Sequence, residues 1–387
     1  MSSIRPATSA DDGSEIAAVE AHVYSAPLSR PVGFAQGWVE RREAAVARVV
    51  TAGGTAGWGE AYAPARPAAA AIATVAPHYL GCSVFERVAV GRSAYHRLRD
   101  YGRSGVLCAA LSAVATACCD AAARALGVPA WALLGGRARP ALRPYASGLF
   151  FAPGDDPTAH YAETTRALLD AGFDGVKLKI GLGVEADARA VERVLGAAGA
   201  GTAVMADANH AYDWVAAVAL ERRLAQYPLA WLEEPLSPEH PGAYARLRER
   251  ATLPLAGGES LGTRHDGRAW LSAGACDILQ PDLSLAGGLD EAVAIGAMAE
   301  AWEVRVAPHC FGLGIGLAAS LHWAAVLASD GMGAEPVWIE VDTLENPIRD
   351  ALLADSAWFG AHGATLALPQ GPGLGVDPER IAAFRVV

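Results

Sequence analysis

The chain has 387 residues, of which 52% are hydrophobic and 19% are charged, so it can bury a large core and is not expected to be disordered. It carries 42 acidic against 31 basic residues, a formal net charge of −11, and no long run of Lys or Arg. This balance argues against nucleic acid or an anionic membrane surface as a partner. A small anionic substrate would need cations gathered locally at its binding site.

The mean hydropathy of +0.21 raises the question of a membrane segment. The stretch from Val306 to Ser329 holds no charged residue and is long enough to span a bilayer, but Pro308, His309 and His322 within it argue against that interpretation. Residues 1–13 lack a basic stretch followed by an apolar one, so no signal peptide is expected. The sequence therefore predicts a cytoplasmic protein with a disordered start over residues 1–13. Its six cysteines form no CxxC pair and are expected to be buried thiols.

Residues 1–140 are expected to form a small α+β domain. Three strands with turn residues between them predict an antiparallel meander over Glu15–Tyr24, Ala44–Val50 and Ala56–Tyr62. An apolar helical pattern follows over Leu107–Leu126 and stops at a glycine and a proline. The segment Leu133–Gly136 is the predicted boundary.

From residue 141 onward, short β-rich runs alternate with helical stretches. The eight expected strands are Leu142–Ser147, Gly175–Ile180, Ala203–Ala208, Ala230–Glu234, Leu255–Glu259, Asp277–Pro281, Val304–His309 and Val337–Val341. Strands that alternate with helices pair in parallel through right-handed crossovers, and eight of them close into a (β/α) barrel. A doubly wound open sheet is the alternative. It is disfavoured because no GxGxxG motif joins a first strand to a helix, and Gly312–Gly316 has the wrong spacing.

An ionisable residue stands at the end of almost every predicted strand. In chain order these residues are Lys179, Asp207, Glu233, Glu259, Asp282, His309 and Glu340. The intervals between them are 28, 26, 26, 23, 27 and 31 residues, each about one strand-helix unit. Equivalent positions on neighbouring strands therefore carry these groups at the carboxyl end of the barrel, where active sites are built.

Three of these residues, Asp207, Glu233 and Glu259, are carboxylates on adjacent strands. Three converging negative charges repel one another unless a cation lies among them, and oxygen ligands without Cys or His suit Mg²⁺ rather than zinc. The alternative is that each carboxylate pairs with a neighbouring Arg or caps a helix. Three in register at strand ends favour a Mg²⁺ site.

Lys177 and Lys179 point the same way because side chains alternate along a strand, while Val176, Leu178 and Ile180 face the outer helices. Two ammoniums in a barrel mouth repel each other. We expect this repulsion, together with a nearby metal, to lower the pKa of both lysines and to let Lys179 act as a base.

Asp282 and His309 end adjacent strands and are expected to touch. A carboxylate bonded to one imidazole nitrogen fixes the tautomer and raises the basicity of the other nitrogen. The pair is therefore a candidate general base on the side of the site opposite the lysines. A lone His in an apolar run is more often a core residue, and the barrel spacing of this pair favours the catalytic interpretation.

The motif Lys177-x-Lys179, the three carboxylates, the pair Asp282/His309 and Glu340 together resemble the mandelate racemase/muconate lactonizing enzyme subgroup of the enolase superfamily. The match extends over nearly the whole chain, because Gly57–Glu60 and Leu133–Gly136 fit as well. The resemblance implies an α+β capping domain on a modified TIM barrel, (β/α)₇β. It places the barrel at residues 141–345 and a C-terminal segment that returns to the capping domain at 346–387.

The same resemblance implies one Mg²⁺ and removal of the proton α to a carboxylate, through an enediolate. Lys177 would neutralise the substrate carboxylate, Glu340 could donate a proton to it, and Asn209 could orient it. Lys179 and His309 would flank the α-carbon on opposite faces. Further motifs resemble cycloisomerases that act on sugar-acid lactones, among them Asp207–His210.

The leaving group decides the outcome. Loss of a lactone ring oxygen gives cycloisomerisation, which we favour; loss of a β-hydroxyl gives dehydration by an acid-sugar dehydratase; no leaving group gives racemisation or epimerisation. The alternative to an enzyme is a binding protein, in which the barrel holds Mg²⁺ and an organic acid without turnover. The partner is expected to be a small sugar acid or its lactone, and the resemblance implies a homo-oligomer.

The resemblance also implies a substrate-facing loop over Ser25–Val39. The predicted substrate-binding residues are Phe34, Gln36, Trp38, Arg41, Asn209, His210 and Trp338.

Overall fold

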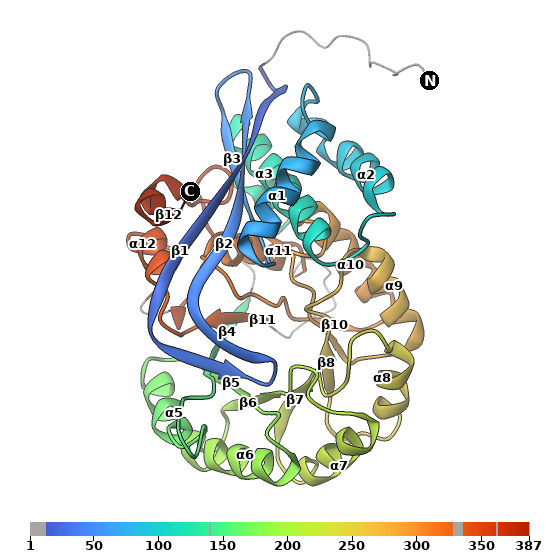
Figure 1. Cartoon of the computed structure of the whole chain (residues 1–387), viewed down its shortest axis with the longest axis vertical. Coiled ribbons are helices and arrows are strands. Elements are labelled where there is room, and N and C mark those ends of the chain that lie inside the picture. The colour runs from blue at the N-terminus through green and yellow to red at the C-terminus, as the bar shows by residue number, and fades with distance from the viewer. Residues whose placement is uncertain (1–12, 139–140, 328–335, 361–362, 387) are drawn as a thin grey trace.

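The computed structural model describes residues 13–138, 141–327, 336–360 and 363–386. Within these ranges the strands form two sheets, one of four strands and one of eight (Figure 1). Except for Gly13, the predicted disordered start at residues 1–13 lies outside the described residues.

The larger sheet is a nearly closed parallel barrel, which confirms the predicted fold. Its order is β10-β9-β8-β7-β6-β5-β4-β11, and every neighbouring pair is parallel. The strands are β4 (Leu142–Leu149), β5 (Gly175–Lys179), β6 (Ala203–Asp207), β7 (Leu229–Glu233), β8 (Leu255–Gly257), β9 (Ile278–Leu279), β10 (Arg305–Val306) and β11 (Val337–Asp342). The predicted strands at 255–259, 277–281 and 304–309 are too long, because the chain leaves the ladder before Glu259, Asp282 and His309 and these residues lie in the loops that follow.

Helices cover the outside of the barrel (Figure 1). They are α5 (Tyr161–Asp170), α6 (Val184–Ala198), α7 (Trp214–Leu224), α8 (Pro241–Arg248), α9 (Arg264–Ala273), α10 (Leu289–Ala301) and α11 (Ile315–Leu327). A further helix, α12 (Pro347–Leu353), packs against β1 (Ile16–Phe34) of the smaller sheet. In α6, Ala188, Val191 and Val194 recur every three residues and are buried in the same apolar cluster as Val176 and Leu178 of β5. The outward faces of the strands and the inward faces of these helices thus form one core.

The smaller sheet is antiparallel and has the order β12-β1-β2-β3. It consists of β1 (Ile16–Phe34), β2 (Gly37–Thr51), β3 (Ala56–Ala61) and β12 (Arg385–Val386). It packs against α1 (Ala65–Val75) and α3 (Val106–Ala125), and α3 in turn contacts α2 (Arg87–Leu98) and α4 (Ala130–Leu133). Short 3₁₀ turns lie at Ala76–His78, Val84–Glu86 and Pro378–Phe384. Because β12 pairs with β1, the last described residues return to this N-terminal capping domain.

Helix α3 is the one described helix long and apolar enough to cross a membrane, yet most of it is buried. It packs on β3 at two glycines of the Gly57–Glu60 motif. A Cβ on Gly57 would lie 2.1 Å from the carbonyl oxygen of Ala117, and a Cβ on Gly59 would lie 2.1 Å from that of Ala113. Only glycine permits this approach, so packing inside the protein accounts for the apolar surface of α3.

The expected loop over Ser25–Val39 is wrong, because β1 and β2 continue through it as one long hairpin that turns at Ala35 and Gln36. Figure 1 shows this hairpin, in dark blue, descending from the capping domain across the barrel. Near its turn, the backbone N–H and C=O of Gly33 bond those of Phe151, which follows β4, at 2.8 and 2.7 Å. Pairing with a barrel loop therefore completes the hydrogen bonds of a segment that sequence alone suggested to be irregular.

Candidate active site

Asp207, Glu233 and Glu259 converge at the carboxyl ends of three consecutive strands. Strand register pairs Asp207 of β6 with Glu233 of β7, and Glu259 follows β8. All three are buried, and one ligand oxygen from each lies within 4.8 Å of the others. Oε2 of Glu259 is buried and accepts no hydrogen bond from the described residues. A buried carboxylate oxygen that accepts no hydrogen bond, among two more carboxylates, fits a hard divalent cation such as Mg²⁺.

We call Asp207, Glu233 and Glu259 the carboxylate cage, and two buried lysines of β5 contact it. Lys177 Nζ lies 2.6 Å from Glu233 Oε1 and 2.8 Å from Glu340 Oε1, and Lys179 Nζ lies 2.5 Å from Asp207 Oδ2. Mutual repulsion does not dominate the lysine pKa values in this arrangement, and the expected lowering by a nearby metal stays a prediction. Burial lowers both values, but the neighbouring carboxylates outweigh burial and the second ammonium, so the pKa of each lysine is raised.

Asp282 and His309 meet as predicted: His309 Nδ1 lies 2.8 Å from Asp282 Oδ2. The other ring nitrogen, Nε2, lies 3.3 Å from Glu259 Oε2 and faces the carboxylate cage. Burial lowers the pKa of His309, but the nearby carboxylates of Glu259, Glu340 and Asp282 raise it by a larger amount, so that the pKa is about 10. An imidazole anchored through Nδ1 has Nε2 free to carry a proton toward the cage.

Glu340 of β11 contacts the same cluster, but the predicted role as a proton donor does not fit its environment. Burial raises its pKa, whereas Lys177, His309 and Lys179 lower it by a larger amount, to about 2. The side chain is therefore an ionised carboxylate. It forms an ion pair with Lys177 and so holds the ammonium group of that lysine in place.

A cavity of about 620 Å³ opens above these groups, between the barrel and the capping domain. Lys179, Glu259, His309 and Glu340 line it from the barrel side. Of the predicted substrate-binding residues, Phe34, Arg41 and Asn209 line it as well. The buried Oδ1 of Asn209 has no hydrogen-bond partner among the described residues, so the cavity contains an acceptor ready for a ligand donor.

The structure places the other four predicted substrate-binding residues outside the lining of this cavity. Gln36 donates from Nε2 to the carbonyl oxygen of Asn209 at 2.6 Å and so ties the hairpin to the loop after β6. Trp38 is 50% exposed, and His210 forms an ion pair with the buried Glu234. The assignment of Trp338 to the substrate pocket is wrong.

Trp338 lies two residues before Glu340, deeper inside the barrel. Its ring meets those of Tyr145 and Trp231 edge-on, at centroid distances of 6.1 Å. The alternation that points Glu340 inward at the mouth points Trp338 inward one layer below it. It fills the barrel interior and does not reach the substrate.

Several lining residues were not among the predicted site residues: Arg42, Glu60, Tyr62, Phe150 and Phe311. Tyr62 follows β3, and its ring centroid is 5.2 Å from that of His309. Glu60 belongs to the Gly57–Glu60 motif, so an acidic residue directly after two obligatory glycines was a signal that sequence reasoning could have used. The phenylalanines carried no such signal, because apolar residues beside strands are expected in any barrel.

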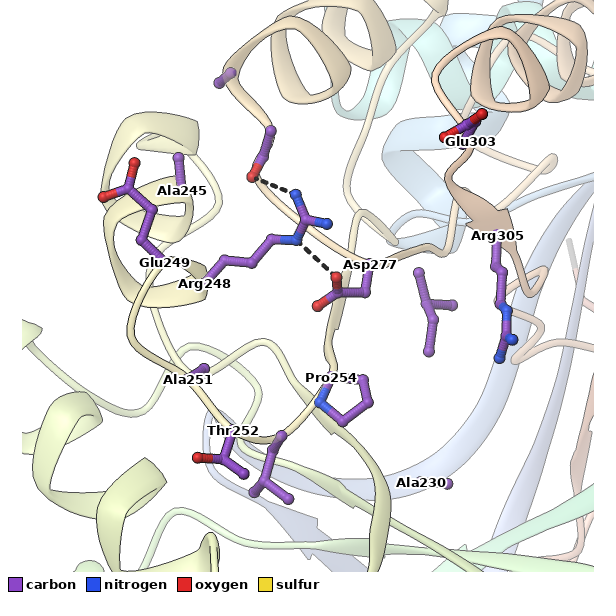
Figure 2. A pocket seen from close by; sticks show the side chains of 14 residues that line it. Ala230, Ala245, Arg248, Glu249, Ala251, Thr252, Pro254, Asp277, Glu303 and Arg305 are labelled. Carbon is purple, nitrogen blue, oxygen red and sulfur yellow. Dashed lines mark hydrogen bonds and ion pairs between the residues drawn. The ribbon is translucent and has the colours of Figure 1, made fainter.

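A second cavity, of about 720 Å³, lies at the opposite end of the barrel, against residues that precede or begin β8, β9 and β10. Figure 2 shows its charged side chains, with Arg248 bonded to Asp277 and to the carbonyl oxygen of Gly274. The Arg248 Nε to Asp277 Oδ1 distance is 2.7 Å. Two of its charged groups thus satisfy each other, which is typical of the stabilising end of such a barrel rather than of an active site.

The chain resembles known proteins over almost its whole length. Residues 160–382 match the family described as Enolase C-terminal domain-like, and residues 18–135 match the Mandelate racemase / muconate lactonizing enzyme, N-terminal domain. The chain is 36% identical over 370 residues to the D-galactarolactone cycloisomerase of Agrobacterium fabrum, which covers 95% of this chain and 97% of that protein. It is 34% identical over 346 residues to a D-galactonate dehydratase of Ralstonia pickettii, covering 85% and 87% of the two chains.

Solved structures of similar proteins lead to the same family as the sequence comparisons. The crystal structure of the 3,6-anhydro-D-galactonate cycloisomerase from Zobellia galactanivorans superimposes with a TM-score of 0.85 at 32% identity, covering 97% of this chain and 100% of that one. An enolase from Bradyrhizobium, complexed with magnesium and mandelic acid, has a TM-score of 0.81 at 25% identity, covering 96% and 99%. Both the fold and the curated relatives therefore point to one group of enzymes.

Proposed function

The chain belongs to the mandelate racemase/muconate lactonizing enzyme family of the enolase superfamily, and from that premise we propose that it removes the proton α to the carboxylate of a sugar acid, with Mg²⁺ as cofactor. The observation that carries the proposal is the placement of Lys179 and His309. Lys179 ends β5 and His309 follows β10, on well-separated parts of the barrel ring, and both line one cavity with Glu259 between them in the chain.

Asp207, Glu233 and Glu259 would hold one Mg²⁺. The ion would supply positive charge where negative charge develops on the substrate carboxylate as the α-proton leaves. Lys177, fixed by Glu233 and Glu340, adds a second positive charge beside the cage. Asn209 Oδ1 can accept a hydrogen bond from a substrate hydroxyl and so orient the α-carbon.

His309 Nε2 and Lys179 Nζ are the proton-carrying atoms on either side of the bound acid. Asp282 holds the imidazole by Nδ1, so the ring exchanges its proton only through Nε2. One of the two groups takes the α-proton, and the other gives a proton to the leaving group or returns one to the α-carbon.

The favoured outcome is cycloisomerisation of a sugar-acid lactone, in which the ring oxygen leaves. Support comes from the Agrobacterium and Zobellia relatives, both of which are named cycloisomerases. Dehydration of an open-chain acid sugar is the second candidate, because the Ralstonia pickettii relative is named a dehydratase. Racemisation or epimerisation would follow if nothing leaves.

The test is exchange of the substrate α-proton in D₂O. The purified protein with Mg²⁺ is incubated with aldonic acids, aldaric acids and their lactones, and products are followed by NMR. We expect exchange or turnover that is lost in Lys179→Met and in His309→Asn. Retention of full activity by His309→Asn, with loss in Lys179→Met, would contradict the two-base proposal. Binding of an acid without any exchange would show a binding protein instead.

A further inference from the structure

The walls of the cavity show which acids fit it. Building on the proposed function, we propose that the site selects acids with one free carboxylate and a compact ring, and that it discriminates against open-chain dicarboxylates. Four features carry this inference: the location of the cations, the commitment of both arginines, the acidic groups of the outer cavity and an aromatic wall beside Lys179.

The cations that can receive a carboxylate gather at one end of the cavity. Lys177, Lys179 and His309 all surround the carboxylate cage at the barrel mouth. They provide for one carboxylate at that position. A second carboxylate on the same substrate would have to lie toward the capping domain, several carbon atoms away.

In the part of the chain that the structure describes, each arginine lining the outer cavity already has a carboxylate partner. Arg42 is buried, lies 2.9 Å from Asp342 Oδ2, donates to the carbonyl oxygen of Glu345 and packs over the ring of Phe311 at 4.5 Å. Arg41 donates from Nε and Nη2 to Ser25 Oγ, and its Nε lies 3.5 Å from Glu43 Oε1.

Two acidic side chains also line this outer part, Glu43 and the buried Glu60. Both oxygens of Glu60 accept hydrogen bonds from backbone N–H groups. Oε1 of Glu43 accepts a hydrogen bond from the Ser25 hydroxyl at 2.7 Å and lies 3.5 Å from Arg41 Nε. A second substrate carboxylate would meet these acids without a free cation to offset the cost of leaving water.

The wall beside Lys179 is aromatic. The rings of Phe150 and Phe311 stack at a centroid distance of 5.7 Å and an interplanar angle of 26°, and Lys179 Nζ lies 5.0 Å from the centroid of Phe150. Phe34 and Val39 of the hairpin extend the apolar lining. A lactone or anhydro ring presents a flat C–H face that packs on such a wall, whereas an extended polyol chain would leave its hydroxyl groups facing carbon.

The test is a comparison of kcat/KM across matched substrates with the Mg²⁺-loaded enzyme. The panel holds aldarate monolactones and 3,6-anhydroaldonates, each with one carboxylate and a ring, against open-chain aldarates with two carboxylates and aldonates with one. We expect the ring monoacids to exceed the aldarates by about 100-fold or more in kcat/KM. The aldonates should fall between, because they lack only the ring.

A variant tests the cause. Val39→Arg adds an uncompensated cation to the hairpin wall, and Val39→Gln adds a polar side chain without the charge. We expect Val39→Arg to raise the ratio of aldarate to ring-monoacid kcat/KM by about tenfold, and Val39→Gln to leave that ratio within about twofold of the parent.

The outcomes separate this inference from the proposed function. Equal kcat/KM for aldarates and ring monoacids would overturn the selectivity while the α-proton chemistry stands. No exchange with any acid would overturn the proposed function itself. An unchanged ratio in Val39→Arg, in a variant that retains ring-monoacid turnover, would show that missing positive charge is not the cause of discrimination.

Discussion

Glu60 of the capping domain accepts a hydrogen bond on Oε1 from the backbone N–H of Leu313, at 2.6 Å, in the loop between His309 and α11. Its Oε2 accepts from the N–H of Gly316 at 2.9 Å, so one side chain caps the start of a helix that belongs to the barrel. A Cβ on Gly312 would lie 2.3 Å from Glu60 Oε1, which explains the glycine there. The capping domain thereby fixes the loop that carries His309.

Replacing Glu60 should therefore impair catalysis through the position of His309. We expect Glu60→Ala to lower kcat/KM by about 10- to 100-fold, since small displacements of a catalytic group cost this much. Glu60→Gln retains one acceptor oxygen and should lose less. The check is kcat/KM together with its pH profile, because a shifted profile reports on His309. Loss of thermal stability with kcat/KM and profile unchanged would contradict a positioning role.

Asp282 should act through His309 in a separate way. Asp282→Asn keeps the shape but removes the charge that stabilises the imidazolium and fixes the tautomer. We expect kcat to fall by about 10²- to 10⁴-fold, with substrate binding little changed. Single-turnover kinetics and a binding titration measure the two effects. Equal losses in binding and in kcat would point to a collapsed site rather than a mispositioned base.

Metal dependence follows from the carboxylate cage. Removing divalent cations with a chelator should abolish α-proton exchange, and Mg²⁺ should restore it. Glu259→Gln removes one of three charges, so we expect Mg²⁺ affinity to fall by at least about tenfold in calorimetry. Glu249→Gln, an exposed glutamate at the far end of the barrel, is the matched control. Unchanged affinity in Glu259→Gln would remove this residue from the ligand set.

The sequence predicted the barrel well because its signal is local and repeated. All predicted barrel strands but the first end at or next to an ionisable residue, and this nearly equal spacing is enough to bring Asp207, Glu233 and Glu259 together at one end of a barrel. The direction in which each pKa is shifted cannot be predicted from this spacing. The pKa directions of Lys177 and Glu340 depend on contacts of 2.8 Å between strands that are distant in sequence.

The capping domain was predicted less well, for a related reason. The hairpin of β1 and β2 extends to Phe34 because Gly33 pairs with Phe151 in the barrel, a contact more than 100 residues away along the chain. Trp338 shows the limit of alternation, which gives the inward direction but not the depth of a side chain in the barrel. The domain boundaries at 140 and 345, the cytoplasmic location and the homo-oligomer stay predictions.

Asp120 should be a stabilising residue at the junction of three segments. Its buried carboxylate accepts from the N–H groups of Trp58 and Leu374, at 2.9 and 2.7 Å, and from Arg124 Nε. Asp120→Ala leaves these donors without partners, so we expect a loss of about 3–5 kcal/mol in the free energy of unfolding. Asp377→Ala, which removes an exposed side chain whose Oδ1 accepts from the N–H of Glu379 at 3.2 Å, should cost far less. Similar melting temperatures for the two variants would contradict this role.

His322 should make stability depend on pH. It is fully buried on α11, its Nδ1 accepts from the N–H of Trp131 at 3.0 Å, and burial lowers its pKa to about 4 from the ordinary 6.5. The folded state therefore binds this proton less readily than the unfolded state. Stability from the neutral ring is complete above pH 6.5 and is lost as the pH falls toward 4, by about 3 kcal/mol in all.

The measurement is the melting temperature of the wild type and of His322→Gln between pH 7.5 and 4.5. Because an amide does not titrate in this range, we expect the difference between the two proteins to shrink as the pH falls. His96→Gln, at an exposed position, serves as the control and should parallel the wild type. A constant difference between wild type and His322→Gln across the range would mean that the pKa of His322 is the same in the folded and unfolded states, and that the ring contributes through packing alone.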